Sequence, residues 1–416
     1  MCGIAAYLGK KNAKEILFDC LQRMEYRGYD SCGIALIEDG TSRVICFKDK
    51  GRISELKERA ENISINAHCG IAHTRWATHG APLKKNAHPH RNGSSNIFVV
   101  HNGIIENFEK LRERLIEEGY FFHSDTDTEV IPHLITKHYK KDLLVAVVKT
   151  ARCLQGSFSF CVISSLEPAK IIGVRFFSPL VLGKAKDGLF LASDIPAFLP
   201  YTRKVVYLED GEIVLLEENK FCVMDFKGRV KRKVLVSVNI SFEQAQKKGY
   251  KHFMLKEIFE QPGVIKDIYF RCVKNRKVEF DGVHLSKGFL KRLKRIHIVA
   301  CGTAFHAGLV GKYLFEKWAG LQCIAEVSSE FRYKDINIDD REELFLTISQ
   351  SGETADTLAS LKLARKMGMR TLGICNVPGS SLTREVESVI YTEAGPEIGV
   401  ASTKAYTCLL YTSPSP

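Results

Sequence analysis

The chain has 416 residues, of which 45% are hydrophobic and 26% are charged, and 60 basic against 48 acidic residues give a net charge of +12. These values are ordinary for a globular protein of two or three domains, and they exclude long disordered, collagen-like or coiled-coil sequences. The sequence contains no apolar run of membrane-spanning length and no signal-peptide pattern. We therefore expect a cytoplasmic protein that binds neither membranes nor, because acidic residues are interspersed with the basic ones, nucleic acid.

The first half of the chain combines short strand patterns with a few amphipathic helices. Strands are predicted at residues 3–8, 31–37, 44–47, 97–101, 158–164, 171–174, 189–193 and 213–216. Helices are predicted at residues 14–24, 106–118, 128–139 and 143–154. Many short strands with few helices indicate a layered α+β domain, which we place at residues 2–240.

The pattern changes after residue 240. Residues 241–289 are charged and are predicted to be a linker, and the basic stretch 274–295 is interpreted as a solvated surface. Strands are then predicted at residues 295–300, 323–327, 344–349, 371–375 and 388–392, with helices at 303–318 and 355–367. Repeated strand–helix–strand units predict an α/β domain with a parallel, doubly wound sheet.

Cys2 is the most distinctive of 13 cysteines. Because no Cys-x-x-Cys pair occurs, a zinc site is not expected, and most of the cysteines are interpreted as small core residues. Removal of Met1 would leave Cys2 with a free α-amine of pKa about 8, which can accept the thiol proton. One residue would then supply both nucleophile and base; the alternative is an incidental cysteine at the second position.

Three further segments of the first half concentrate polar groups. Residues 73–80 read His-Thr-Arg-Trp-Ala-Thr-His-Gly, and Asn102-Gly103 directly follows an apolar strand. An Asn side chain beside a backbone N–H supplies the donor pair of an oxyanion hole. The third segment, residues 124–129, places two aspartates just before a helix. Turn formation and helix capping are the structural alternatives for the last two segments.

Together with Cys2-Gly3-Ile4 and Arg27-Gly28-Tyr29-Asp30-Ser31, these segments resemble the glutaminase domain of class II glutamine amidotransferases. Proteins of that family are N-terminal-nucleophile hydrolases with an αββα fold. The resemblance implies that Cys2 is the nucleophile. It also implies that the Asn102 side chain and the Gly103 N–H form the oxyanion hole.

The same resemblance implies a glutamine site. Arg75 would bind the α-carboxylate of glutamine as a bidentate partner, and Asp127 would bind its α-ammonium group. Trp76, Thr78 and His79 would lie on the loop that closes over glutamine. Trp76 also resembles the family's gate to an ammonia passage.

The second half contains a hydroxyl-rich turn between a predicted strand and a predicted helix. Ser349, Ser351 and Thr354 cluster where the helix begins, and Thr303 occupies a similar turn after an earlier strand. A helix N-terminus with free N–H groups favours phosphate, and the absence of a P-loop lysine disfavours a nucleoside triphosphate. Ordinary N-capping by serine and threonine is the alternative.

These turns belong to a larger set of matching segments, residues 300–303, 328–333, 349–354, 376–381 and 399–404, that resemble a sugar-isomerase (SIS) domain over residues 290–407. The resemblance implies that the sugar-phosphate site contains Thr303, Ser349, Gln350, Ser351, Thr354 and Val400. An alanine, Ala304, stands where that family usually has serine, which removes one hydroxyl contact to the sugar.

A glutaminase domain joined to a SIS domain resembles the family of glutamine–fructose-6-phosphate aminotransferases. The resemblance implies that ammonia released from glutamine is transferred to fructose 6-phosphate, which gives glucosamine 6-phosphate and glutamate. It implies no metal ion or organic cofactor, and a homodimer for the full-length protein. A non-catalytic SIS regulator that binds sugar phosphates and a glutaminase that serves another acceptor remain as alternatives.

The family also carries a second SIS domain and a C-terminal tail, which this sequence does not match. We therefore expect a C-terminally truncated chain with a non-native tail at residues 408–416. Such a fragment would retain glutaminase activity only.

Overall fold

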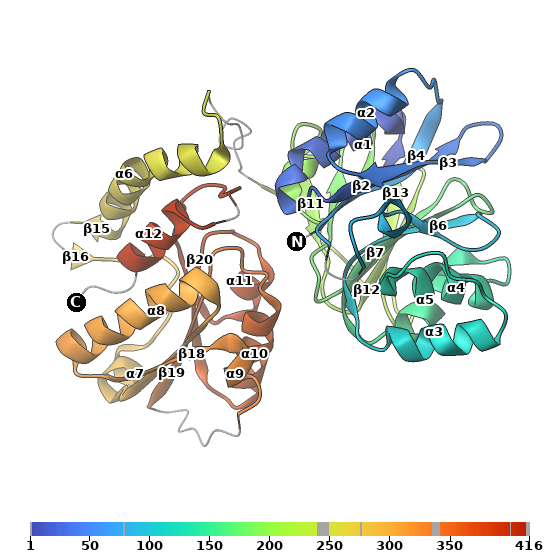
Figure 1. Ribbon diagram of the computed structural model, residues 1–416. Coiled ribbons are helices and arrows are strands. Elements are labelled where there is room, and N and C mark those ends of the chain that lie inside the picture. Colours follow the sequence, from blue (N-terminus) through green and yellow to red (C-terminus); the bar gives the residue numbers. More distant parts are fainter. Residues whose placement is uncertain are drawn as a thin grey trace. The chain divides into compact units, whose positions relative to one another are not determined.

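The structure is a computed structural model that describes residues 2–77, 80–238, 249–274, 277–334, 342–399 and 401–412. Thr78, His79 and Val400, which the sequence places in the two sites, therefore lie outside the described residues. The chain divides into two compact units, Met1–Phe242 and Glu243–Pro416, each built around its own sheets (Figure 1).

The first unit contains two stacked antiparallel sheets. One has the strand order β14-β11-β9-β10-β1-β4-β2-β3, and the other has the order β13-β12-β8-β7-β6-β5. The strands of the first sheet are β1 (Gly3–Gly9), β2 (Ser31–Glu38), β3 (Val44–Lys50), β4 (Ala67–Arg75), β9 (Val181–Lys184), β10 (Gly188–Ala192), β11 (Lys204–Tyr207) and β14 (Val236–Ser237). Those of the second sheet are β5 (His90–Arg91), β6 (Ile97–Ile105), β7 (Gly156–Ser164), β8 (Ile171–Phe176), β12 (Glu212–Glu217) and β13 (Lys220–Asp225).

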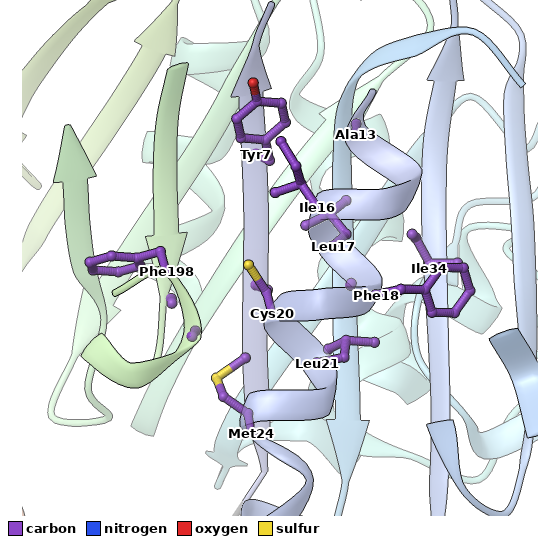
Figure 2. Close-up of a cluster of buried hydrophobic side chains, with 14 of the residues drawn as sticks. Tyr7, Ala13, Ile16, Leu17, Phe18, Cys20, Leu21, Met24, Ile34 and Phe198 are labelled. Carbon is purple, nitrogen blue, oxygen red and sulfur yellow. The ribbon is translucent and has the colours of Figure 1, made fainter. Parts of the chain in front are cut away.

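Helices cover the outer face of each of these sheets. Helices α1 (Ala13–Arg23) and α2 (Ile53–Glu61) pack on the first sheet, and α3 (Phe108–Glu117), α4 (Val130–His138) and α5 (Leu143–Cys153) pack on the second. The two-residue period of β1 decides which side chains face which layer. Ile4, Ala6 and Leu8 fill the space between the sheets, whereas Tyr7 packs against α1, as Figure 2 shows. This is the αββα fold that the resemblance implies.

The second unit contains a parallel sheet of order β18-β17-β19-β20-β21. Its strands are β17 (Arg295–Ala300), β18 (Gln322–Val327), β19 (Glu343–Ser349), β20 (Arg370–Cys375) and β21 (Ser388–Tyr391). One face packs against α7 (Lys287–Arg292), α8 (Gly302–Leu314) and α12 (Lys404–Thr412), and the other against α9 (Ser328–Phe331), α10 (Ala355–Lys366) and α11 (Ser381–Glu385). Helices on both faces of a parallel sheet confirm the predicted doubly wound α/β arrangement.

Two segments of the second unit lie where the sequence predicted a linker and a tail. Helix α6 (Phe253–Cys272) and the hairpin of β15 (Val273–Lys274) and β16 (Lys277–Val278) occupy much of residues 241–289. Ile268 and Cys272 of α6 pack against Cys408 of α12, and Leu409 lies in the core beneath the sheet. The boundaries of the linker and of the tail stay predictions.

The sequence analysis missed β4, which lies between β1 and β2 in the first sheet. Its residues, Ala-His-Cys-Gly-Ile-Ala-His-Thr-Arg, are small or polar, and all but His68 are buried. A strand buried on both faces loses the alternation of apolar and polar residues on which strand prediction depends. The strands β9, β11 and β13 were also missed.

Candidate active sites

Cys2 lies at the entrance to β1, beside the last residues of β4. The pairing of Gly3 with Thr74 brings Cys2 against the segment that follows Arg75. The Trp76 N–H donates to Cys2 Sγ at 3.3 Å, and the thiol donates to the Trp76 carbonyl at 3.5 Å. Burial raises the pKa of the Cys2 thiol, while the contact with Trp76 acts in the opposite direction. The thiol therefore needs a local base before it can act as a nucleophile.

Two side chains hold the backbone of Cys2. Asn102 Nδ2 donates to the Cys2 carbonyl at 3.1 Å, and Arg27 Nε donates to the same oxygen at 3.0 Å. Arg27 is buried, and its guanidinium forms an ion pair of 2.9 Å with Asp194, which also accepts from Tyr26. The Arg27 side chain thus places the nucleophile through its main chain, a role that the sequence analysis did not assign.

Asn102 and Gly103 are consecutive residues of β6, opposite Ser159 and Phe158 of β7. Gly103 has a φ of +112°, and a Cβ at this position would come within 1.9 Å of the Ser157 carbonyl oxygen. Only glycine tolerates both the dihedral angle and the close approach. Gly103 is exposed, whereas Asn102 is buried, so the backbone of Gly103 is accessible beside the anchored amide of Asn102.

Arg75 and Asp127 supply opposite charges near Cys2. Arg75 is buried and donates to the carbonyls of Gly80 at 3.0 Å and Ala81 at 3.4 Å. Burial lowers the pKa of Arg75, while the nearby Cys2 and Asp127 act in the opposite direction. Asp127 accepts from the Ile105 N–H at 2.8 Å. An amino acid has one group for each of these charges, so the pair can recognise its α-carboxylate and α-ammonium groups.

The loop after β4 is held by several contacts. The Ala77 N–H donates to Asp30 at 2.8 Å, and the Trp76 ring packs edge-on against Tyr29 at 5.6 Å. Gly28 approaches the Arg75–Trp76 peptide so closely that a Cβ would lie 2.6 Å from the Arg75 carbonyl carbon. Trp76 and Arg75 therefore lie close to Cys2, while their glutamine-binding roles stay predictions.

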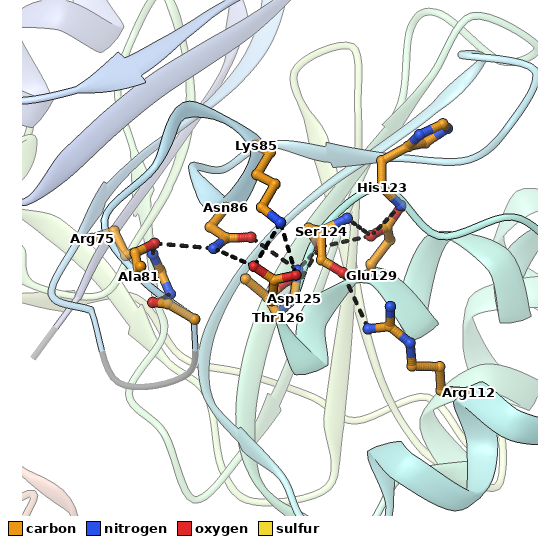
Figure 3. A network of polar contacts seen from close by, with 11 residues as sticks. Arg75, Ala81, Lys85, Asn86, Arg112, His123, Ser124, Asp125, Thr126 and Glu129 are labelled. Carbon is orange, nitrogen blue, oxygen red and sulfur yellow. Dashed lines mark hydrogen bonds and ion pairs between the residues drawn. The ribbon is translucent and has the colours of Figure 1, made fainter.

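A polar network fixes the segment that carries Asp127 (Figure 3). The side chain of Asn86 accepts from the Asp125 N–H at 2.9 Å and donates to the Ala81 carbonyl at 3.0 Å. Glu129 is buried and accepts from the N–H and the hydroxyl of Ser124, each at 2.6 Å. The network joins the carbonyls that bind Arg75 to the turn that holds Asp127, so the two charged groups keep a fixed separation.

The hydroxyl-rich turn of the second unit lies at the carboxyl end of β19. Ser349 Oγ accepts from the Gly352 N–H at 3.0 Å and lies 3.3 Å from the hydroxyl of Thr354, which precedes α10. Glu353 accepts from the N–H and the hydroxyl of Ser381 at 2.8 and 2.9 Å, which ties the turn to α11. The turn thus presents hydroxyl and N–H groups at the start of a helix, where anions bind favourably.

Thr303 and Ser349 follow neighbouring strands, because β17 pairs with β19 in parallel. Thr303 is exposed in the first turn of α8, whereas Ala304 is buried in the apolar cluster beneath the sheet. Gln350 follows Ser349, and its carbonyl accepts from the Asn376 N–H at 3.2 Å. Both turns therefore open at one edge of the sheet, where ligands of open α/β sheets bind.

Within the parts of the chain that the structure describes, no cluster of three or more His, Cys, Asp or Glu side chains could hold a metal ion. In the same residues, no helix is long and apolar enough to span a bilayer.

Comparison with known proteins agrees with both halves of this description. Residues 73–200 match the glutamine amidotransferase domain family, and residues 289–412 match the SIS domain family. A glutamine–fructose-6-phosphate aminotransferase (isomerizing) of Clostridium tetani is 50% identical over 98% of this chain and 66% of its own length. The enzyme of that name from Aquifex aeolicus is 48% identical over 99% of this chain and 68% of its own length. The chain thus spans about two thirds of the length of these curated relatives.

A solved structure supports the fold. Glutamine phosphoribosylpyrophosphate amidotransferase from B. subtilis, complexed with ADP and GMP, aligns with 90% of this chain and 81% of its own, at a TM-score of 0.50 and 17% identity.

Proposed function

This chain belongs to the family of glutamine–fructose-6-phosphate aminotransferases, and we propose that its first unit hydrolyses glutamine to glutamate and ammonia. The observation that carries the proposal is the convergence of the Cys2 thiol, the Asn102 amide and the Arg75 guanidinium at one end of β1, β4 and β6. In the reaction for which that family is named, the ammonia aminates fructose 6-phosphate to give glucosamine 6-phosphate.

The chemistry starts with removal of Met1, which converts the amide nitrogen of Cys2 into an amine. The amine accepts the thiol proton, and the thiolate attacks the side-chain amide carbon of glutamine. Asn102 Nδ2 carries two hydrogens, of which the Cys2 carbonyl uses one. The other hydrogen and the Gly103 N–H stabilise the tetrahedral oxyanion. The Cys2 ammonium group returns its proton to the leaving nitrogen, so collapse of this intermediate releases ammonia and leaves a glutamyl thioester. Water then hydrolyses the thioester to glutamate and regenerates the Cys2 thiol.

Glutamine is recognised through its α-groups. Arg75 binds the carboxylate and Asp127 binds the ammonium group, in agreement with their burial and their opposite charges. The family resemblance assigns Thr78 and His79 to the loop that closes over the substrate, and Trp76 of the same segment contacts the thiol through its backbone. Because Arg75 is held by backbone carbonyls, its guanidinium is preorganised for a planar carboxylate.

The second unit binds the phosphate of fructose 6-phosphate. Ser349, Ser351 and Thr354 supply hydroxyls at the start of α10, and Gln350 lies in the same turn. Thr303 lies at the same edge of the sheet, and Val400 is assigned to the site by the family resemblance. We assign no residue of this chain to the isomerisation, so the 416-residue chain by itself is expected to release glutamate without aminating the sugar.

The test is to incubate the chain, with loss of Met1 verified by intact mass, with glutamine and fructose 6-phosphate and to quantify both products in one tube. Glutamate without glucosamine 6-phosphate is the expected result. Both products together would show that this chain also aminates the sugar, against our assignment. Absence of glutamate would contradict the glutaminase assignment.

A further inference from the structure

Four buried histidines lie close to Asn102 in the first unit. His73 is on β4, His101 is on β6, and His88 and His90 come from the segment between these strands. The rings of His73 and His88 stack with centroids 4.0 Å apart, and His90 meets His88 edge-on at 4.6 Å. The mechanism described above uses none of them.

The contacts of His73 determine which of its nitrogens carries the proton. His73 Nε2 lies 2.9 Å from the His101 carbonyl oxygen and 3.0 Å from Asn102 Oδ1. A backbone carbonyl can only accept a hydrogen bond. Nε2 must therefore carry the hydrogen, which it shares between the two oxygens.

This proton position in turn orients the Asn102 amide. With a donor at Nε2, Asn102 has to present Oδ1 to His73, which points Nδ2 toward the Cys2 carbonyl, 3.1 Å away. Rotation of the amide by 180° would place the Asn102 NH2 group against the Nε2–H of His73. It would also place Oδ1 against the Cys2 carbonyl oxygen, so neither end could form a hydrogen bond. In a buried site each unsatisfied polar group keeps its desolvation cost without a compensating hydrogen bond, so the observed orientation is strongly preferred.

The buried environment of Nδ1 keeps the imidazole of His73 neutral. Nδ1 of His73 is buried and has no hydrogen-bond partner among the described residues, and the ring of His88 stacks on the plane of the His73 ring. Burial lowers the pKa of His73 to about 3, and the hydrogen bond to Asn102 opposes this only in part. His73 is consequently a fixed donor through the neutral pH range rather than a proton carrier.

We propose that His73 is a positioning residue for glutamine hydrolysis, whose Nε2–H holds the Asn102 amide with its NH2 group facing Cys2, where it can donate to the oxyanion. The inference rests on the proposed function, because it concerns the oxyanion donor of that reaction. It assigns a task to a side chain that touches neither glutamine nor the nucleophile.

Two substitutions separate the hydrogen bond from the packing. His73→Leu removes the donor, whereas His73→Gln can present an amide NH2 near the position of Nε2. Removal of an oxyanion-hole donor typically lowers kcat by 100- to 1,000-fold, so loss of its positioning partner is expected to lower kcat by about 10- to 100-fold. The KM for glutamine should change little, since Arg75 and Asp127 are untouched. His73→Gln should recover most of kcat.

The matched control is Phe18→Leu, which truncates a buried aromatic side chain of α1 on the outer side of the first sheet, away from the residues of the site. Both leucine variants should unfold at lower urea concentration, but only His73→Leu should lose kcat. Equal loss of kcat in both, or an unchanged kcat in His73→Leu, would overturn the positioning role. Failure of the parent to release glutamate would instead contradict the proposed function.

An independent readout is the ¹⁵N NMR spectrum of histidine-labelled full chain, which distinguishes the two neutral tautomers of His73 without any turnover. The assignment requires Nε2–H and an unprotonated Nδ1 at neutral pH. Observation of the Nδ1–H tautomer would refute the orientation argument directly.

Discussion

Gly103→Ala probes the close contact of β6 and β7 on which the oxyanion site depends. The methyl group would lie 1.9 Å from the Ser157 carbonyl oxygen and 2.8 Å from Ser178 Oγ. Neither strand can yield alone, because Gly103 pairs with Phe158 within a nine-residue ladder. The strands therefore have to separate locally, and the Gly103 N–H moves away from the position that the oxyanion requires.

The expected cost has two parts. A non-glycine residue at the positive φ of +112° costs about 1–3 kcal/mol. The overlap with Ser157 adds about 1–3 kcal/mol, as overpacking does elsewhere. The free energy of unfolding of the first unit should thus fall by about 2–6 kcal/mol, a large share of the 5–15 kcal/mol typical of a domain. Glutamate release by the folded fraction should also fall sharply.

The control is Gly119→Ala, since Gly119 has a φ of +89° and an added Cβ would meet no atom of the described residues within 4 Å. It measures the cost of the positive φ alone, which is expected at about 1–2 kcal/mol. Urea unfolding is followed by the fluorescence of Trp76 in a Trp318→Phe background, because the chain has two tryptophans, one in each unit. Equal losses in the two variants would refute the close-contact reasoning.

Two further predictions address the phosphate turn and the Glu129 network. Gly352 has a φ of +65°, and an added Cβ would lie 2.0 Å from Ser380 Oγ. Gly352→Ala should therefore weaken the binding of fructose 6-phosphate, measured by calorimetry, without changing the rate of glutamate release. Gly320→Ala is the control, because Gly320 has the same φ but an added Cβ would meet no described atom within 4 Å, and it should leave binding unchanged. Burial raises the pKa of Glu129, but His133, Ser124 and the His123 N–H outweigh it and lower the pKa to about 2. Because this folded-state pKa lies below the usual value of about 4.3, the stability from Glu129 is complete above that pH and is lost as the pH falls toward 2. Glu129→Gln should therefore lower the urea midpoint of unfolding at pH 7. It should also make that midpoint fall less between pH 5 and pH 3 than it does in the parent. An equal fall in the two proteins over this pH range would contradict the prediction.

Local sequence patterns were sufficient for the elements with clear periodicity. The apolar runs of β1 and β17 predicted strands close to their observed bounds. The run of β6 predicted where that strand begins, but the strand continues through Asn102 and Gly103 to Ile105. The turn at Ser349 was found because hydroxyls cluster at a strand–helix junction. Strand β4 was missed, since burial on both faces removes its alternation. It nevertheless carries Arg75 into the site.

The contacts that hold the nucleophile could not be predicted from local patterns. Arg27 belongs to a segment that the sequence analysis singled out, but its partner Asp194 lies 167 residues away in a short turn with no distinguishing pattern. The bond from His73 to Asn102 likewise depends on how β4 and β6 of different sheets face each other. Such pairings follow from sheet stacking, which depends on the whole domain rather than on a segment.

The central claim is that Cys2 is the nucleophile of glutamine hydrolysis. The most direct test compares glutamate release by the parent chain, by Cys2→Ala and by Cys153→Ala. Intact mass first verifies that Met1 is absent from each protein. Cys153 is an exposed cysteine of the same unit and serves as the matched control. The account predicts that Cys2→Ala abolishes glutamate release and that Cys153→Ala leaves it unchanged. Glutamate release by Cys2→Ala at the rate of the parent would contradict the account.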